Sequence, residues 1–136
     1  MVNCKGQCDI MSLADSILQL NQAIRYVAIL DTSNTVIECK GQGTFSLPLS
    51  PETLADFVAI GPLLVLGALG HNLEPSCGRL DYTIGRFEKA LVVIYQLRSH
   101  MVVLVMDSIV NTQQLEEIAT TLKKMEETLT QTRKPN

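Results

Sequence analysis

ALVVIYQLRSHMVVLVM, residues 90–106, is the stretch that decides the fold of this 136-residue chain. Residues 90–97 and 101–106 lack the alternation of apolar and polar residues that marks a half-exposed strand. A strand that is apolar on both faces lies inside a sheet that is covered on both sides. The short polar turn at 98–100 joins the two strands as an antiparallel pair. The stretch therefore predicts the interior of an antiparallel sheet with helices on both faces.

Three more segments extend this sheet. Residues 25–30 (RYVAIL) are also apolar almost throughout, whereas residues 35–40 (TVIECK) and 80–87 (LDYTIGRF) alternate, as edge strands do. Hairpin turns place the second strand beside the first, and the fourth strand between the third and the fifth. Only the strand order 2-1-5-4-3 then leaves both alternating strands at the edges of the sheet.

Helices are expected at both ends of the domain. Ser12 and Asp15 predict the N-cap and the acidic third residue of a first helix over 13–22. In the last helix, apolar residues recur at intervals of three and four and predict a narrow apolar stripe on a polar helix: Leu115, Ile118, Leu122, Met125 and Leu129. The charged residues that flank this stripe, Glu126 among them, are expected to form a solvated face.

A central helix is expected between the second and third strands. Residues 50–52 (SPE) predict its start, Pro62 predicts a kink or break, and a loop containing Pro75 follows at 72–78. Its run FVAIGPLLVLGALG (57–70) carries no charge. The run is too short for a bilayer, which takes ~20 apolar residues, and too apolar for a surface helix. We therefore expect a partner to cover its outer side.

Together these elements predict an α+β fold, a three-layer α/β/α sandwich with the topology αββαβββα. The central helix is expected on one face of the sheet, and the first and last helices are expected to share the other. One domain is expected over 12–130, after a flexible extension at 1–11 and before a loose tail at 131–136.

Composition argues against several classes of function. The chain has a net charge of −3 and 4% aromatic residues with no Trp, which argues against nucleic-acid binding. Its first residues lack an apolar signal core, so we expect a cytoplasmic protein with reduced cysteines and no membrane insertion. Cys4 and Cys8 have no matching downstream pair, so no metal or other cofactor is expected. A redox or zinc role for these two cysteines remains a separate hypothesis.

The sequence contains no recognisable catalytic constellation. His71 follows the central helix, where a cation is mildly favoured, and His100 lies in a strand turn, where we expect it to be solvated. Gly41 and Gly43 precede a loop and not a helix, which favours a turn over a phosphate-binding role. The sequence therefore predicts a protein without enzymatic activity.

Two segments resemble a known family. The opening hairpin IRYVAILDTSNTVIECKG (24–41) and the closing strand VVLVMD (102–107) are similar to those of Roadblock/light-chain-7 proteins, which are related to longin and profilin-like domains. The resemblance extends over residues 13 to about 129, and an uncharacterised archaeal group of this size is the most similar. It implies a homodimer in which third strands pair across the two-fold axis and central helices pack together. It also implies a scaffold or regulator, since many members bind small Ras-like GTPases.

The expected dimer interface combines the apolar run with the third strand: Phe57, Ile60, Leu64, Gly67, Ala68, Leu80, Tyr82 and Ile84. Pairing of two such edge strands hides a row of backbone groups that would otherwise lack partners. An alternative is a ligand sensor of the PAS-like or profilin-like kind, with a cavity that the kink at Pro62 opens between sheet and helix. The dimeric module is the favoured hypothesis, because few polar groups are available there to orient a ligand.

Overall fold

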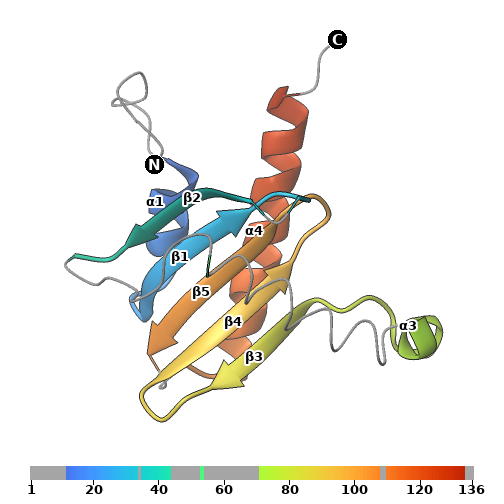
Figure 1. Ribbon diagram of the computed structural model, residues 1–136, viewed down its shortest axis with the longest axis horizontal. Coiled ribbons are helices and arrows are strands. Elements are labelled where there is room, and N and C mark those ends of the chain that lie inside the picture. The colour runs from blue at the N-terminus through green and yellow to red at the C-terminus, as the bar shows by residue number, and fades with distance from the viewer. Residues whose placement is uncertain (1–11, 34, 44–52, 54–70, 108–109, 134–136) are drawn as a thin grey trace.

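Five strands and three helices occur in the part of the chain that the computed structural model describes, residues 12–33, 35–43, 53, 71–107 and 110–133. In chain order they are α1 (Leu13–Leu18), β1 (Ile24–Leu30), β2 (Val36–Gly41), α3 (His71–Cys77), β3 (Tyr82–Arg86), β4 (Ala90–Gln96), β5 (Met101–Asp107) and α4 (Thr112–Arg133) (Figure 1). The strands form one antiparallel sheet in the order β2-β1-β5-β4-β3. This confirms the α+β class and the strand order expected from the sequence.

β1 and β5 lie at the centre of the sheet and are buried on both faces, as their apolar sequences predict. In β1, Val27 and Ile29 belong to the larger core cluster, and Ala28 and Leu30 belong to a second cluster on the opposite face. β4 differs from the prediction, because its residues alternate between buried and half-buried. β4 lies between β5 and the edge strand β3, and on the face of the second cluster its residues Val92 and Ile94 are only partly buried against the buried residues of β1 and β5.

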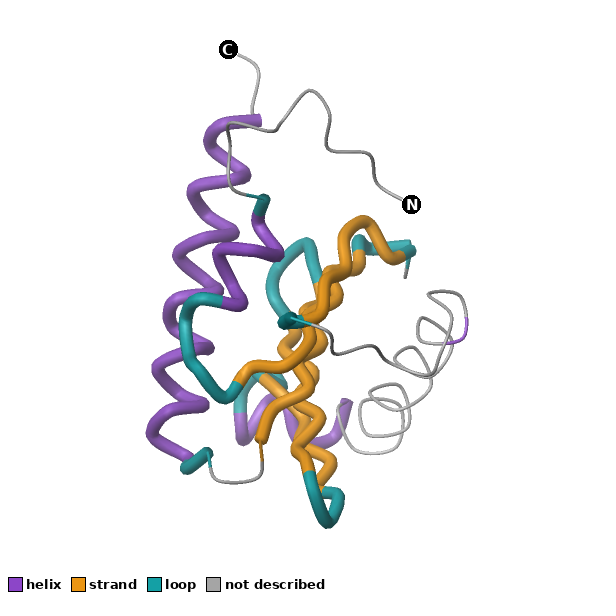
Figure 2. Tube along the Cα trace, turned by 90° about the vertical axis from the view of Figure 1, so that its left-hand side faces the viewer, coloured by secondary structure: helices purple, strands orange, loops and turns teal. Residues whose placement is uncertain are grey.

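α1 and α4 pack on the same face of the sheet, as the sequence predicts. Figure 2, in which the sheet is seen edge-on, shows the long helix α4 on one side of the strands. Both helices contribute buried side chains to the larger core cluster: Ala14 and Ile17 from α1, and Leu115, Ile118, Ala119 and Leu122 from α4. The hydroxyl of Tyr95 in β4 also donates a hydrogen bond of 3.1 Å to the carbonyl oxygen of Leu115. Sheet and helix are thus joined by one apolar layer and a buried polar contact.

The N-cap of α1 agrees with the prediction, but the helix is shorter than expected. The backbone N–H of Asp15 donates to Oγ of Ser12 at 3.1 Å. The helix ends at Leu18, not at residue 22. The side chain of Asn21 accepts the backbone N–H of Ala23 at 2.8 Å, which turns the chain into β1 before another helical turn can form.

α4 begins with a reciprocal cap that the sequence analysis did not single out. Gln114 donates its backbone N–H to Oδ1 of Asn111, and Asn111 donates its own to Oε1 of Gln114, both at 2.9 Å. This is a capping box with Asn and Gln in the two positions. At its other end the helix continues to Arg133, so its last residues lie in the segment expected as a loose tail.

The predicted loop at 72–78 is wrong in part, because His71–Cys77 form the short helix α3. Pro75 lies just beyond its first turn, where the missing N–H forgoes one helical hydrogen bond. The chain leaves the helix at Gly78, which has a left-handed φ of 81° and donates to the carbonyl oxygen of Glu74 at 2.8 Å. Gly78, and not Pro75, therefore ends this helix.

The central helix, expected to run from residue 51 towards residue 72, lies mostly outside the described residues. This applies to the predicted kink at Pro62 and to five of the predicted interface residues: Phe57, Ile60, Leu64, Gly67 and Ala68. No helix in the part of the chain that the structure describes is long and apolar enough to span a membrane.

Candidate functional site

β3 forms one edge of the sheet and pairs only with β4 among the described strands. At one end, Gln96 donates its backbone N–H to the carbonyl oxygen of Asp81, and at the other, Phe87 donates to the carbonyl oxygen of Ala90, both at 2.8 Å. In an antiparallel pair, residues alternate between facing the partner strand and facing away from it. Since 81 and 87 bond to β4, the backbone groups of the even-numbered residues, such as Ile84, point to the open edge.

The side chains at this edge are partly apolar. Ile84 is 44% exposed, and Phe87, just after the strand, is 60% exposed. Leu80 is half-buried and lies just before the strand begins. The edge therefore offers both free backbone directions and apolar side chains to a pairing strand.

Tyr82 is turned towards α4 and is held within its own chain. Its ring lies 5.2 Å from that of Tyr95, centroid to centroid, at an interplanar angle of 47°. Its hydroxyl donates a hydrogen bond to the carboxylate of Glu116 on α4. This hydrogen bond, together with burial, raises the pKa of Tyr82 to about 12. Of the predicted interface residues that are described, Leu80, Tyr82 and Ile84 thus share one edge, and Ile84 is the one that is exposed.

At the turn between β4 and β5, two predictions about solvation are wrong. His100 and Glu126 were expected to be solvated, but their side chains are only 11% and 8% exposed. Nδ1 of His100 lies 2.9 Å from Oε2 of Glu126. The same carboxylate accepts the backbone N–H groups of Arg98 at 2.8 Å and Ser99 at 2.7 Å. The carboxylate is buried because these turn N–H groups have no strand partner and need an acceptor.

The pKa of Glu126 reflects two opposing effects. Burial raises it, and the hydrogen bonds from His100, Ser99 and Arg98 lower it; the hydrogen bonds prevail, so the pKa lies below its ordinary value. A sequence signal for this burial exists, since Glu126 follows Leu122 by four residues and so lies on the apolar side of the helix. The prediction treated every charged residue of α4 as solvated and missed it.

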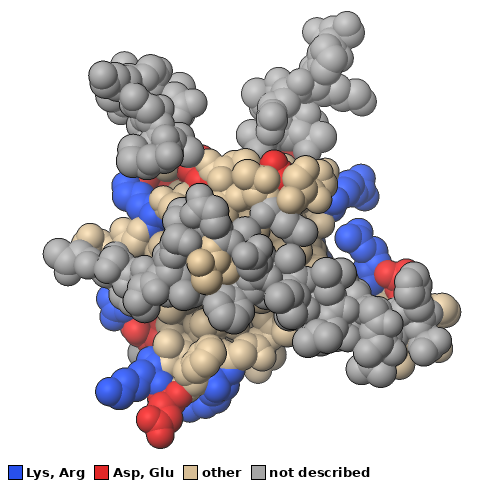
Figure 3. All heavy atoms as spheres, in the orientation of Figure 1, with Lys and Arg blue, Asp and Glu red and all other residues tan. Residues whose placement is uncertain are grey.

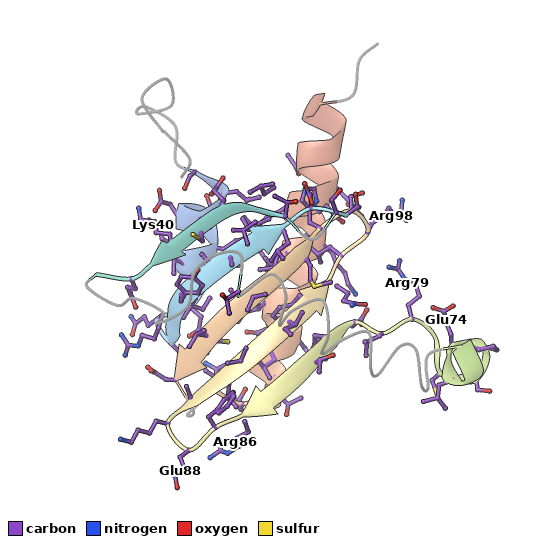
Figure 4. The ribbon with its side chains drawn as sticks, viewed as in Figure 1. Lys40, Glu74, Arg79, Arg86, Glu88 and Arg98 are labelled. Carbon is purple, nitrogen blue, oxygen red and sulfur yellow. The ribbon has the colours of Figure 1, made fainter. Side chains whose placement is uncertain are left out.

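A groove of about 610 Å³ lies where α4 passes the start of β3 and the end of β4. Arg79 and Arg98 both line it, and Figure 4 shows them next to each other at this edge of the molecule. Figure 3, in the same orientation, shows basic side chains projecting there. The space between the helices and the sheet is much smaller: a cavity of about 20 Å³ lined by Ile17 and Leu122, among others. A cavity of this size is too small for a sensor ligand.

The redox or zinc hypothesis concerns two cysteines that lie outside the described residues, so it stays a prediction. Cys39 and Cys77 are free and exposed, and Cys4 and Cys8 lie outside the described residues. Within the described ranges, no three His, Cys, Asp or Glu side chains gather in a way that could hold a metal ion.

Comparisons with known proteins agree with the fold. No protein-family model and no curated protein matches this sequence. The gliding protein MglB from Thermus thermophilus is similar with a TM-score of 0.63 and 21% identity, over 84% of this chain and 85% of that one. An MglB structure with a tetrameric arrangement has a TM-score of 0.63 and 18% identity, over 84% and 85%.

A third similar structure carries the name of the fold. The Roadblock/LC7 domain from Streptomyces avermitilis has a TM-score of 0.62 and 13% identity, over 86% of this chain and 93% of that one. At these identities the similarity shows the fold, and the chain has the Roadblock/LC7 fold that its sequence resembles. The finer likeness to an archaeal group remains a prediction.

Proposed function

We propose that this protein is a non-enzymatic, homodimeric regulatory module of the Roadblock type, and that the protein partner of the dimer is a small Ras-like GTPase. The observation that carries the proposal is the β3 edge. Its outward backbone groups meet no described strand, and Ile84 is 44% exposed beside them. An exposed apolar edge strand can pair with a strand of another chain. A stable protein therefore either covers such an edge or pairs it in an interface.

In a homodimer with its two-fold axis beside β3, the β3 strands of the two copies would lie next to each other and pair. Each β3 would donate and accept the outward hydrogen bonds of the other, so that the two sheets join into one. The apolar run 57–70 would complete the interface by packing against its counterpart, through Phe57, Ile60, Leu64, Gly67 and Ala68. Backbone pairing supplies direction to this contact, and the apolar run supplies buried area.

Two further points support the assembly and the partner. A similar MglB structure has a tetrameric arrangement, so a protein with this fold can self-associate. We propose a GTPase as the partner because the hairpin 24–41 and the strand 102–107 resemble those of Roadblock proteins, many of which bind small Ras-like GTPases.

Light scattering after size-exclusion chromatography tests the homodimer. We expect the wild-type protein to have twice its monomer mass at micromolar concentration, and Ile84→Lys to be a monomer, because a charge on an edge strand opposes pairing. Cys39→Lys is the matched control, since it places the same charge on the exposed surface of the other edge strand, β2. A wild-type monomer, or equal dissociation in both variants, would contradict the proposal.

Affinity capture tests the GTPase partner separately. The dimer is immobilised, exposed to an extract of its source cells, and the bound nucleotide-binding protein is then purified and titrated back in its GTP and GDP forms. We expect saturable binding that distinguishes the two nucleotide states. Captures that never recover a nucleotide-binding protein would count against this half of the proposal and leave the homodimer standing.

A further inference from the structure

The groove beside α4 is built around one backbone contact between β3 and β4. The hydrogen bond of 2.8 Å from Gln96 N–H to the carbonyl oxygen of Asp81 holds the end of one strand against the start of the other. Arg79 precedes this pair by two residues and Arg98 follows it by two, so the topology brings the arginines to the same opening. The pairing of β3 with β4 therefore fixes the positions of the two chain segments that carry these arginines.

The groove is lined by as many basic as acidic side chains, but only some of them have partners within the protein. Its charged lining residues are Arg79, Asp81, Arg98, Lys123, Glu126 and Glu127. Lys123 forms an ion pair with Asp81, with Nζ 3.3 Å from Oδ1. The carboxylate of Glu126 accepts the backbone N–H groups of Arg98 and Ser99 and contacts Nδ1 of His100. Two guanidinium groups and one carboxylate, that of Glu127, are left without an ion-pair partner among the described residues.

The position of Arg98 is fixed more firmly than that of an ordinary surface arginine. Its backbone N–H donates to the buried carboxylate of Glu126 at 2.8 Å, so the turn that carries it is tied to α4. Its guanidinium group makes no ion pair with a described residue. An arginine presented from an anchored turn loses less conformational entropy on binding an oxyanion than one on a loose loop.

We infer that this groove is a binding site for an acidic peptide segment of a partner protein, with Arg79 and Arg98 each taking a carboxylate. The planar fork of a guanidinium group matches a carboxylate in a two-bond geometry. The formal charges of the whole lining cancel, but Asp81 and Glu126 are held within the protein, which leaves the two guanidinium groups with one free carboxylate, that of Glu127. A singly charged carboxylate fits such a field better than a dianionic phosphate. The site uses no residue of the expected dimer interface and does not depend on the GTPase.

Fluorescence anisotropy with a labelled hexaglutamate peptide at low salt tests the site, with hexaglutamine as the neutral control. Because the whole chain has a net charge of −3, it repels a polyanion in general, and binding reports a local site. We expect the double variant Arg79→Gln/Arg98→Gln to raise the Kd about tenfold or more, since two charge-assisted contacts are lost. Glu127→Gln is expected to lower the Kd about twofold or more by removing a like charge.

Arg86→Gln is the matched control, because it removes the same charge at the opposite end of β3, as Figure 4 shows. The inference is supported if hexaglutamate binds, the double variant loses binding and Arg86→Gln retains it, with unchanged thermal melts. It is overturned if hexaglutamate does not bind, if hexaglutamine binds as well, or if Arg86→Gln weakens binding equally. Stronger competition by a phosphoserine peptide or by inorganic phosphate than by hexaglutamate would overturn the assignment to carboxylates.

Discussion

At the scale of single residues, Glu126 has the clearest structural role. One carboxylate, 8% exposed, accepts two backbone N–H groups and contacts His100 across the β4–β5 turn. A buried charge is tolerated only where it is fully paired, and here the pairing also serves donors that no strand reaches. The contact ties the middle of α4 to a turn 26 to 28 residues away in the chain. It therefore couples the helix to the sheet.

We expect Glu126→Gln to lower the free energy of unfolding by about 1–3 kcal/mol at neutral pH, because the buried donors lose a charged acceptor. Urea titration followed by circular dichroism measures this. Glu127→Gln is the control, since its exposed side chain makes no such contact with a described residue, and it should change stability by less than about 0.5 kcal/mol. Equal effects of the two substitutions would contradict the assigned role.

The effect of Glu126 depends on pH with a definite sign. Its folded-state pKa is depressed, so its contribution is fully present above the unfolded pKa of ~4.3 and is lost as the pH falls through the folded value. The difference in unfolding free energy between wild type and Glu126→Gln should therefore shrink below about pH 4. A difference that stays constant down to acid unfolding would show that the carboxylate charge is not what stabilises the turn.

At the scale of elements, local polar contacts explain where α1 and α4 begin and where α3 ends. α4 depends on the reciprocal bonds between Asn111 and Gln114, which satisfy two N–H groups at its start. We expect Asn111→Ala to destabilise the protein by about 1 kcal/mol. Gln113→Ala, in the same first turn and equally exposed, should have little effect. Thermal melts of the two variants compare them directly, and similar melting temperatures would rule out the cap as a source of stability.

β3 is the element whose neighbours decide the assembly. Its inner backbone groups bond to β4, and its outer ones meet no described strand, so half of its pairing capacity is available. The two ends of the strand have different surroundings. Arg79 and the groove lie beyond its start, and the exposed Phe87 lies beyond its end. A second copy paired along β3 and an acidic segment bound at Arg79 can therefore use different surfaces.

At the scale of the whole molecule, the homodimer makes folding depend on concentration. We expect the melting temperature to rise with protein concentration between about 2 and about 200 µM, because a dimer that dissociates on unfolding gains about 1.4 kcal/mol per tenfold concentration. The monomeric variant Ile84→Lys should melt at a temperature that does not change with dilution. A wild-type melting temperature that is also constant would speak against an obligate dimer.

The sequence by itself determined the sheet. The apolar strands 25–30 and 101–106 had to lie inside and the alternating ones outside, because the hydrophobic effect acts on composition and period, which can be read locally. Sequence also determined the N-cap at Ser12. It could not place Arg79 beside Arg98, or Glu126 under the β4–β5 turn. These contacts join distant segments, and only tertiary structure decides which unsatisfied backbone group meets which side chain. For the same reason the alternation in 80–87 predicted an edge strand, but not that Tyr82 would bind Glu116 while Ile84 stayed exposed.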